Sequence, residues 1–130
     1  KIVFLDMVSS HRNDTTITLD FEAAIKEAMD YLQLSNHQKI GFLGGKELLD
    51  DNTIYPDPRK EVFIKYCNDH NITYETYLYE DAFTTESGYT MMVEMISKKD
   101  LPTAIFCASD PIAIGALRAL SKLQVLLIPH

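Results

Sequence analysis

Several features that would assign this chain to a specialised class of protein are scarce or missing. Its 130 residues include only five glycines and five prolines, which excludes a collagen-like or low-complexity chain. Positive charge is also scarce, since 12 lysines and arginines stand against 19 acidic residues and give a net charge of −7. Such a chain has no overall positive field to hold a phosphate backbone, so nucleic-acid binding by this segment alone is disfavoured.

Cysteines, long apolar runs and targeting signals are scarce as well. Cys67 and Cys107 lie outside any zinc-ligand or CxxC spacing, so we expect two reduced, buried thiols and no metal site. No run of about 18 apolar residues is present, and no basic segment followed by an apolar one opens the chain. We therefore expect a cytoplasmic protein. Because Lys1 leads at once into a strand-like run, we also expect a fragment.

What the sequence does contain is the composition of one folded domain. Hydrophobic residues make up 46% and charged residues 24% of a chain long enough to bury a core. Strand-like and helix-like segments alternate from end to end, which predicts an α/β fold with a largely parallel sheet flanked by helices. The expected strands cover residues 2–5, 39–43, 72–79 and 103–108, with a weaker candidate at 125–128.

Two helices are expected in the first half of the chain. Apolar residues recur with helical spacing over 21–32, and Asn36 is a candidate for the left-handed residue that ends this helix. The second helix is expected to start at Asp57-Pro58, because aspartate caps a helix and proline suits its first position.

Two more helices are expected in the second half. Thr84 or Thr85 is the expected cap of the third helix, and Asp110-Pro111 repeats the start signal for the fourth. The residues expected to face the core from these helices are Tyr89, Met92, Val93, Ile96, Ala113, Ala116, Leu117 and Leu120.

The residues that follow each expected strand are the candidates for a binding site, because open α/β sheets bind ligands beyond the carboxyl ends of their strands. They include carboxylates, an aromatic ring and a hydroxyl group, and the start of the second helix adds a cation. Such a set suits a polyhydroxylated or planar polar ligand. The candidates are Asp6, Gly44, Gly45, Arg59, Phe83, Ser109 and Asp110.

Ordinary structural roles remain open for these candidates. Asp6 and Asp110 are equally suitable as caps of backbone N–H groups. Phe83 could be an ordinary core residue, and Arg59 could form a solvated ion pair. No histidine or serine stands in a metalloprotease or hydrolase motif, and the glycine pair lacks the spacing of a phosphate-binding loop. The sequence therefore predicts neither an enzyme nor a cofactor site.

Four segments of the chain form an ordered set of motifs. They are Asn-His-Gln-Lys-Ile-Gly-Phe-Leu-Gly-Gly at 36–45, Arg59 with Phe63, Ser-Gly-Tyr at 87–89, and the run at 102–120 that begins Pro-Thr-Ala-Ile-Phe-Cys-Ala-Ser-Asp. In this order they resemble the effector-binding core of LacI/GalR-type bacterial transcriptional repressors. Each segment alone is weak, but the ordered set is specific. Asn36 and Val62 stand where relatives commonly have glycine, and the tail at 123–130 departs from the family pattern.

The resemblance implies a periplasmic-binding-protein-like fold, a three-layer αβα arrangement in which the effector binds between two subdomains. Residues 1–8 are then the last strand of the N-terminal core subdomain and its crossover. Residues 9–130 form the second, C-terminal effector-binding subdomain, incomplete at its C-terminus, and the DNA-binding headpiece is absent.

The resemblance also implies roles for the site residues. Asp6 accepts hydrogen bonds from effector hydroxyls, Arg59 is the cationic donor, and Phe83 stacks on the ligand ring. Ser109 falls where many relatives have asparagine, and Asp110 is a polar contact or a helix cap. A sugar or sugar phosphate is the first choice of effector, and a purine would also stack on Phe83. Effector binding then alters the operator affinity of a homodimer, with no cofactor.

Two other classes of function remain open. A sugar-binding protein of a transport system shares the fold but is exported, and only the regulator-like run at 102–120 argues against it. An enzyme of flavodoxin-like topology would use Asp6 and Asp110 as a metal or acid pair. The absence of a catalytic Lys, His or Cys at the strand ends argues against the enzyme.

Overall fold

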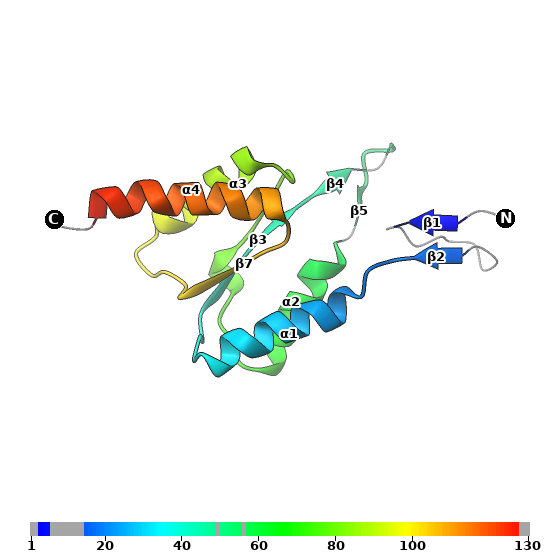
Figure 1. Cartoon of the computed structure of the whole chain (residues 1–130), viewed down its shortest axis with the longest axis horizontal. Helices are drawn as coiled ribbons and strands as arrows, with labels where there is room; N and C mark the ends of the chain where they lie inside the picture. The colour runs from blue at the N-terminus through cyan, green and yellow to red at the C-terminus, as the bar shows by residue number, and fades with distance from the viewer. Residues whose placement is uncertain (1–2, 6–14, 49, 56, 128–130) are drawn as a thin grey trace.

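A three-stranded parallel sheet with the strand order β6-β3-β7 forms the centre of the chain (Figure 1). The computed structural model describes residues 3–5, 15–48, 50–55 and 57–127. The central strand β3 (Ile40–Gly45) is buried along its whole length, whereas β6 (Leu78–Asp81) and β7 (Ala104–Cys107) are mostly half-buried. An apolar run covered on both faces is typical of a central parallel strand.

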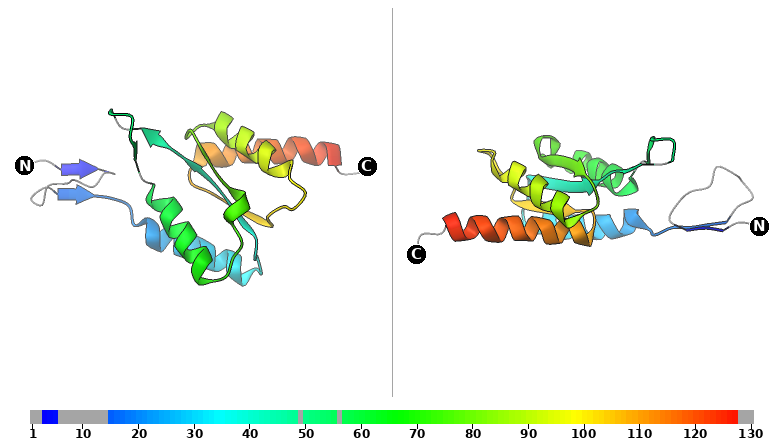
Figure 2. Two further views of the ribbon diagram at one scale, coloured as in Figure 1. Left: turned by 180° about the vertical axis from the view of Figure 1, so that it is seen from behind. Right: turned by 90° about the horizontal axis from the view of Figure 1, so that it is seen from above.

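Two pairs of helices cover the two faces of this sheet and give the molecule three layers (Figure 1, Figure 2). The helices α1 (Phe21–Leu34) and α2 (Pro58–Asp69) lie on one face, and α3 (Thr85–Ile96) and α4 (Asp110–Leu127) lie on the other. The α/β fold with a parallel sheet flanked by helices, which the sequence predicts, is confirmed.

Alternation along β3 sends its side chains into two separate cores. Ile40 and Phe42 pack with α1 and α2, and Leu43 packs with α3 and α4. The centroid of the Phe42 ring lies 5.0 Å from that of Phe63 in α2 and 5.9 Å from that of Phe106 in β7. Burying a side chain of this size stabilises a fold by about 1.5–3 kcal/mol, so β3 holds both helix layers in place.

Several helix ends agree with the signals in the sequence. The side chain of Asp57 accepts a hydrogen bond from the backbone N–H of Arg59, and that of Thr84 accepts one from Ser87, each across 3.0 Å. Asn36 follows α1 in the left-handed conformation, with a φ of 69°. These caps fix where α1 ends and where α2 and α3 begin.

The strand expected at 72–79 is only partly correct. Residues Glu75–Tyr77 form a turn of 3₁₀ helix, η1, Thr73 makes a single parallel bridge, and β6 begins only after this turn. The Tyr77 ring is buried, and its hydroxyl donates to a carboxylate oxygen of Asp100 across 2.8 Å. This contact joins residues far apart in the sequence, so the local pattern of Thr and Tyr does not reveal it.

The start and end of α4 also differ from expectation. The carbonyl oxygen of Ser109 accepts the first helical hydrogen bond, from Ala113, so Ser109 occupies the cap position and Asp110 lies in the first turn. The strand expected at 125–128 is wrong for the described residues, because α4 continues to Leu127. No glycine or proline follows Gly115 until Pro129, so the local sequence does not end the helix earlier.

The faces that α3 and α4 bury are rotated from the expected ones, because the two helices approach closely through small residues. A Cβ atom on Gly88 would lie 2.2 Å from the carbonyl oxygen of Ile112, and one on Gly115 would lie 2.0 Å from that of Thr85. Met92 and Ala116 are buried as expected, but Val93, Leu117 and Leu120 are exposed. The residues buried in addition include Met91, Met95, Ile112 and Ala119.

Two short strand pairs lie outside the central sheet. The expected strand β1 (Val3–Leu5) pairs in parallel with β2 (Thr15–Ile17) beyond the start of α1 (Figure 2). An unexpected antiparallel pair, β4 (Glu47–Leu48) and β5 (Ile54–Tyr55), precedes α2. The division of the chain at residue 8 stays a prediction. None of the helices in the described ranges has the length and apolar character needed to cross a membrane.

Candidate functional site

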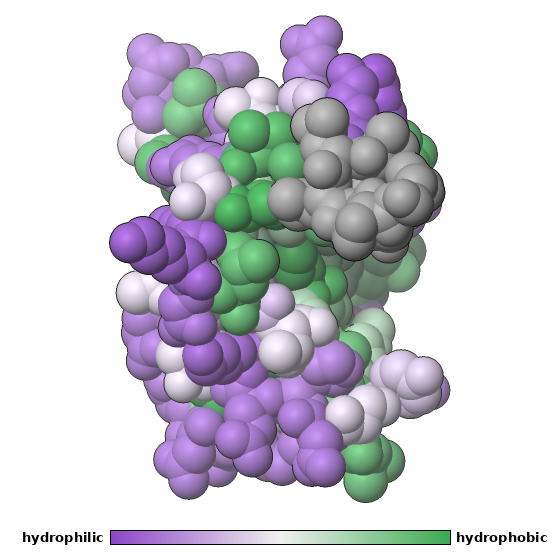
Figure 3. Space-filling view, turned by 90° about the vertical axis from the view of Figure 1, so that its left-hand side faces the viewer, coloured by the Kyte–Doolittle hydropathy of each residue, from purple (hydrophilic) through white to green (hydrophobic). Residues whose placement is uncertain are grey.

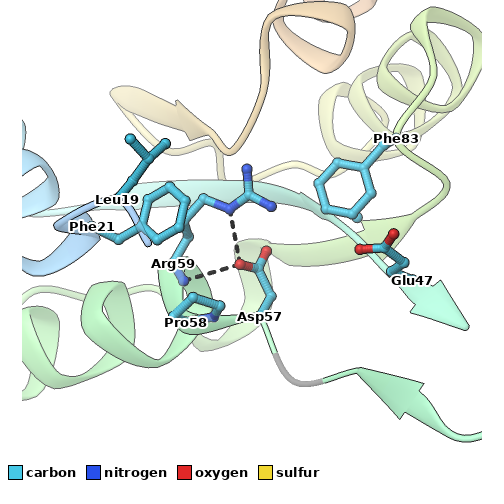
Figure 4. Close-up of a pocket in the computed structure, with 8 residues that line it drawn as sticks. Leu19, Phe21, Glu47, Asp57, Pro58, Arg59 and Phe83 are labelled. Carbon is cyan, nitrogen blue, oxygen red and sulfur yellow. Dashed lines mark hydrogen bonds and ion pairs between the residues drawn. The ribbon is translucent and has the colours of Figure 1, made fainter. Parts of the chain in front are cut away.

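A cavity of about 220 Å³ lies at the carboxyl end of β3, beside the start of α2 (Figure 4). This is the edge at which open α/β sheets bind ligands. Segments far apart in the sequence contribute its walls, from the residues before α1 to the loop after β6. The lining residues are Leu19, Phe21, Gly45, Glu47, Asp57, Pro58, Arg59 and Phe83.

Arg59 is the cation in this lining, and three hydrogen bonds position it. Oδ1 of Asp57 accepts from the backbone N–H of Arg59 across 3.0 Å and from its Nε across 2.8 Å. The Nη1 atom donates to the carbonyl oxygen of Ala108, directly after β7, across 2.8 Å. The side chains of Arg59 and Asp57 are 23% and 7% exposed, so this ion pair is largely shielded from water.

Two aromatic rings flank the guanidinium group of Arg59 (Figure 4). Its Cζ atom lies 5.1 Å from the ring centroid of Phe21 and 4.9 Å from that of Phe83. A cation over an aromatic face gains about 0.5–2 kcal/mol, depending on how far it is desolvated. The rings and the hydrogen bonds together hold the guanidinium in one orientation.

Phe83 belongs both to the cavity wall and to the core. It is half-buried, lines the cavity and packs against the core beneath α3 and α4. A Cβ atom on Gly45 would lie 2.5 Å from atoms of this ring. The ring therefore fits beside the end of β3 only because residue 45 has no side chain.

Two buried polar atoms next to Arg59 and its contacts have no hydrogen-bond partner within the described ranges. They are Oδ2 of Asp57 and Oγ of Ser109, the residue that follows Ala108. An unpaired buried polar group costs about 1–3 kcal/mol, and a ligand or water that pairs with it removes that cost. Both atoms favour a polar ligand at this edge of the sheet.

The structure brings together some of the residues that the sequence singled out. Gly45, Arg59 and Phe83 line the cavity, and Ser109 follows the carbonyl group that Arg59 contacts. Asp110 is exposed in the first turn of α4 and does not line the cavity. Asp6 lies outside the described residues.

Other residues of the site were missed in the sequence. Asp57 was expected only as a helix cap, and Phe21 only on the buried face of α1. The Asp-Pro start signal could have identified Asp57 as a site residue, because the side chain of a helix cap lies within reach of a cation two positions later. Glu47 has no such signal, since the short strand β4 that carries it is not evident from composition or periodicity.

The two cysteines do not add a reactive group. Burial raises the pKa of Cys67 to about 12 and that of Cys107 to about 11, so both are protonated thiols at neutral pH. Both are free, as expected, with Cys67 buried and Cys107 half-buried.

Comparison with known proteins finds relatives of this chain. Residues 29–129 match the family described as periplasmic binding protein-like domain. The chain is 37% identical over 123 residues to the transcriptional regulator GalR of Streptococcus thermophilus, covering 93% of this chain and 37% of that protein. It is 30% identical over 132 residues to the repressor PurR of Proteus mirabilis, covering 92% and 38%. The chain thus spans less than two fifths of the length of these curated relatives.

Solved structures share the fold. The LacI-family regulator from Lactobacillus casei with bound glucose superposes with a TM-score of 0.78 at 21% identity, covering 95% of this chain and 46% of that one. A regulator from Bacillus cereus subsp. cytotoxis gives a TM-score of 0.72 at 26% identity, covering 93% and 42%. The curated relatives are transcriptional regulators and not enzymes, in agreement with the expectation from the sequence.

Proposed function

Because this chain belongs to the periplasmic-binding-protein-like effector-binding domains of the LacI/GalR family, we propose that its cavity binds a small polyhydroxylated effector, with a sugar as the first choice. The cavity of about 220 Å³ is smaller than the roughly 300–1,000 Å³ of most ligand pockets. That size suits one half of a cleft whose other wall comes from a second subdomain.

The observation that carries this proposal is a fixed donor beside a buried acceptor that has no partner. Arg59 uses its Nε and Nη1 in contacts within the chain and retains further N–H groups, while Oδ2 of Asp57 is unpaired in the described part of the structure. Each hydroxyl of a sugar both donates and accepts. Adjacent hydroxyls can therefore satisfy the arginine and the carboxylate together.

Phe83 supports the same ligand class through its apolar ring. A sugar presents a C–H face that packs on aromatic side chains. Cζ of Arg59 lies 4.9 Å from the ring centroid, so a ligand that packs on the exposed part of the half-buried ring lies beside the donors of Arg59. Ser109 adds a hydroxyl nearby, and Asp6 and Asp110 remain proposed contacts of the complete site.

Regulation follows if the effector binds one arrangement of the complete protein better than another. A coupling free energy of about 1–3 kcal/mol would change operator affinity by roughly 5- to 150-fold. The proposed parent protein acts on operator DNA in the cytoplasm through a headpiece outside this chain, and the chain supplies the sensing surface.

Isothermal titration calorimetry with glucose and galactose tests the proposed site. We expect saturable binding to the unaltered chain and a loss of at least about tenfold in affinity for Arg59→Ala, because the variant removes the fixed donors. Lys65→Ala is the matched control, since Lys65 is an exposed cation on the same helix. Equal affinities of Arg59→Ala and the control would refute the role of Arg59.

A further inference from the structure

We propose that this cavity selects a neutral sugar and rejects its phosphate ester. This inference rests on the proposed function and narrows its effector class, since a sugar and a sugar phosphate both present hydroxyl groups to Arg59. The two differ in charge, and the charges around the cavity distinguish them.

The described lining carries an excess of negative charge. One cation, Arg59, faces two carboxylates, Asp57 and Glu47, which gives 1 − 2 = −1. Arg59 is already neutralised by Asp57 at 2.8 Å, and both side chains are largely shielded from water. The arginine can therefore donate hydrogen bonds, but it has no unbalanced charge with which to hold a phosphate group.

Other cations near the cavity do not change this balance. Nζ of Lys60 forms an ion pair with Oε1 of Glu80 across 2.6 Å, and these two side chains are 31% and 15% exposed. Lys46 follows the lining residue Gly45 but is exposed and does not line the cavity. Among the described residues, no cation in the lining is left without a carboxylate partner.

The start of α2 is also unsuited to an anion. Backbone N–H groups at a helix start commonly bind phosphate. Here Pro58 has no N–H group, and the N–H of Arg59 already donates to Oδ1 of Asp57. The carboxylate of the chain itself thus occupies the position that a phosphate oxygen would take.

The unpaired Oδ2 of Asp57 adds a direct preference. A buried carboxylate oxygen accepts a hydrogen bond from a sugar hydroxyl, whereas a phosphate dianion has no proton to donate and is repelled by the same charge. Asp57 attracts the hydroxyls of either ligand, so it favours the neutral sugar through its repulsion of the phosphate group.

Calorimetric titration of the 130-residue chain with glucose, galactose and their 6-phosphates, at pH 7.5 and constant ionic strength, tests this preference. We expect the 6-phosphates to bind roughly fivefold to tenfold more weakly than the neutral sugars, because the shielded carboxylate of Asp57 repels the dianion, whereas the charge of Glu47 is exposed and partly screened. Glu47→Gln removes one negative charge from the wall and should narrow that ratio. Glu94→Gln, an exposed position on α3, is the control for a charge change elsewhere.

Each outcome decides between the two proposals. Equal or tighter binding of a 6-phosphate overturns the inference about charge and leaves the effector site standing. If Glu47→Gln and Glu94→Gln change the ratio of phosphate to sugar affinity equally, the inference about charge is likewise overturned and the effector site stands. Absence of binding by every sugar and every phosphate overturns the proposed function, and the charge inference with it.

Discussion

At the scale of single residues, the candidate site is an arginine held by contacts from four separate segments. Asp57 and Ala108 accept its hydrogen bonds, and Phe21 and Phe83 flank its guanidinium. Orienting the donor before the ligand arrives lowers the entropy that binding must overcome. The site is thus prepared by the folded chain instead of being assembled around the ligand.

A substitution at Gly45 would directly disturb the position of the Phe83 ring against Arg59. In Gly45→Ala the new Cβ atom would lie 2.5 Å from the Phe83 ring and push it toward Arg59. We expect sugar affinity to fall about tenfold and the free energy of unfolding to fall by about 1–3 kcal/mol, because the new Cβ atom meets Cγ at the base of a ring that packs on the core. Calorimetric titration and urea denaturation of the same preparation measure the two effects.

A double-mutant cycle shows whether this loss arises at the ring. In the Phe83→Ala background the added methyl group has free space, so Gly45→Ala should cost no further affinity there. Additive losses from Gly45→Ala and Phe83→Ala would mean that the glycine acts independently of the ring.

The sequence singled out part of this site and missed part of it. Gly45 and Phe83 follow the ends of expected strands, and Arg59 follows the start signal of the second helix. Phe21 joined the site only through tertiary contacts that bring the start of α1 beside Arg59 of α2. Periodicity and composition carry no information about those contacts.

At the scale of elements, the close contact of α3 with α4 decides which residues enter one of the two cores. Gly88 and Gly115 bring the backbones together, and this contact turns Leu117 outward. The existence of both helices follows from caps and apolar spacing. The rotation of each helix about its axis does not follow from these signals. A hydrophobicity scale predicts that leucine is buried before glycine, and it takes no account of how closely two helix backbones approach each other.

Gly88→Ala tests this close approach. The added Cβ atom would lie 2.2 Å from the backbone carbonyl of Ile112, which cannot move without separating α3 from α4. We expect the free energy of unfolding to fall by about 1–3 kcal/mol, even though alanine is the better helix former. Urea denaturation followed by circular dichroism measures the change.

Gly41→Ala provides a graded control for that prediction. Its new Cβ atom would lie 3.0 Å from Cε of Met95, the end of a flexible side chain that can move aside. The smaller cost expected there separates a backbone clash from a general effect of adding a methyl group. A loss at Gly41→Ala as large as that at Gly88→Ala would contradict the account of the helix contact.

At the scale of the whole molecule, hydrophobic side chains gather on the face at which α4 ends (Figure 3). On α4 itself, Ile114, Leu117 and Leu120 are 53%, 62% and 40% exposed and recur every three residues. Arg118 and Lys122 lie beside Ile114 and Leu117 on this surface. Exposed apolar side chains on a helix commonly mark an interface, and a twofold dimer uses the same surface on both copies. We propose that the stripe of Ile114, Leu117 and Leu120 forms part of the homodimer contact that the family resemblance implies.

Leu117→Glu tests that dimer. Placing a charge on the stripe of both copies should weaken self-association at least about tenfold, as measured by sedimentation equilibrium. Leu34→Glu is the matched control, because Leu34 is 88% exposed at the end of α1 and does not belong to the stripe on α4. An unaltered chain that stays monomeric at all concentrations, or equal effects of the two variants, would contradict a dimer through α4.

The response of the Arg59 Nε–Hε resonance to added glucose, followed by nuclear magnetic resonance, shows whether a sugar binds beside Arg59. A sugar held by the guanidinium changes the surroundings of Nε, so the resonance should shift and saturate together with the ring protons of Phe83. If glucose saturates the chain and both signals stay in place, the effector does not bind in this cavity.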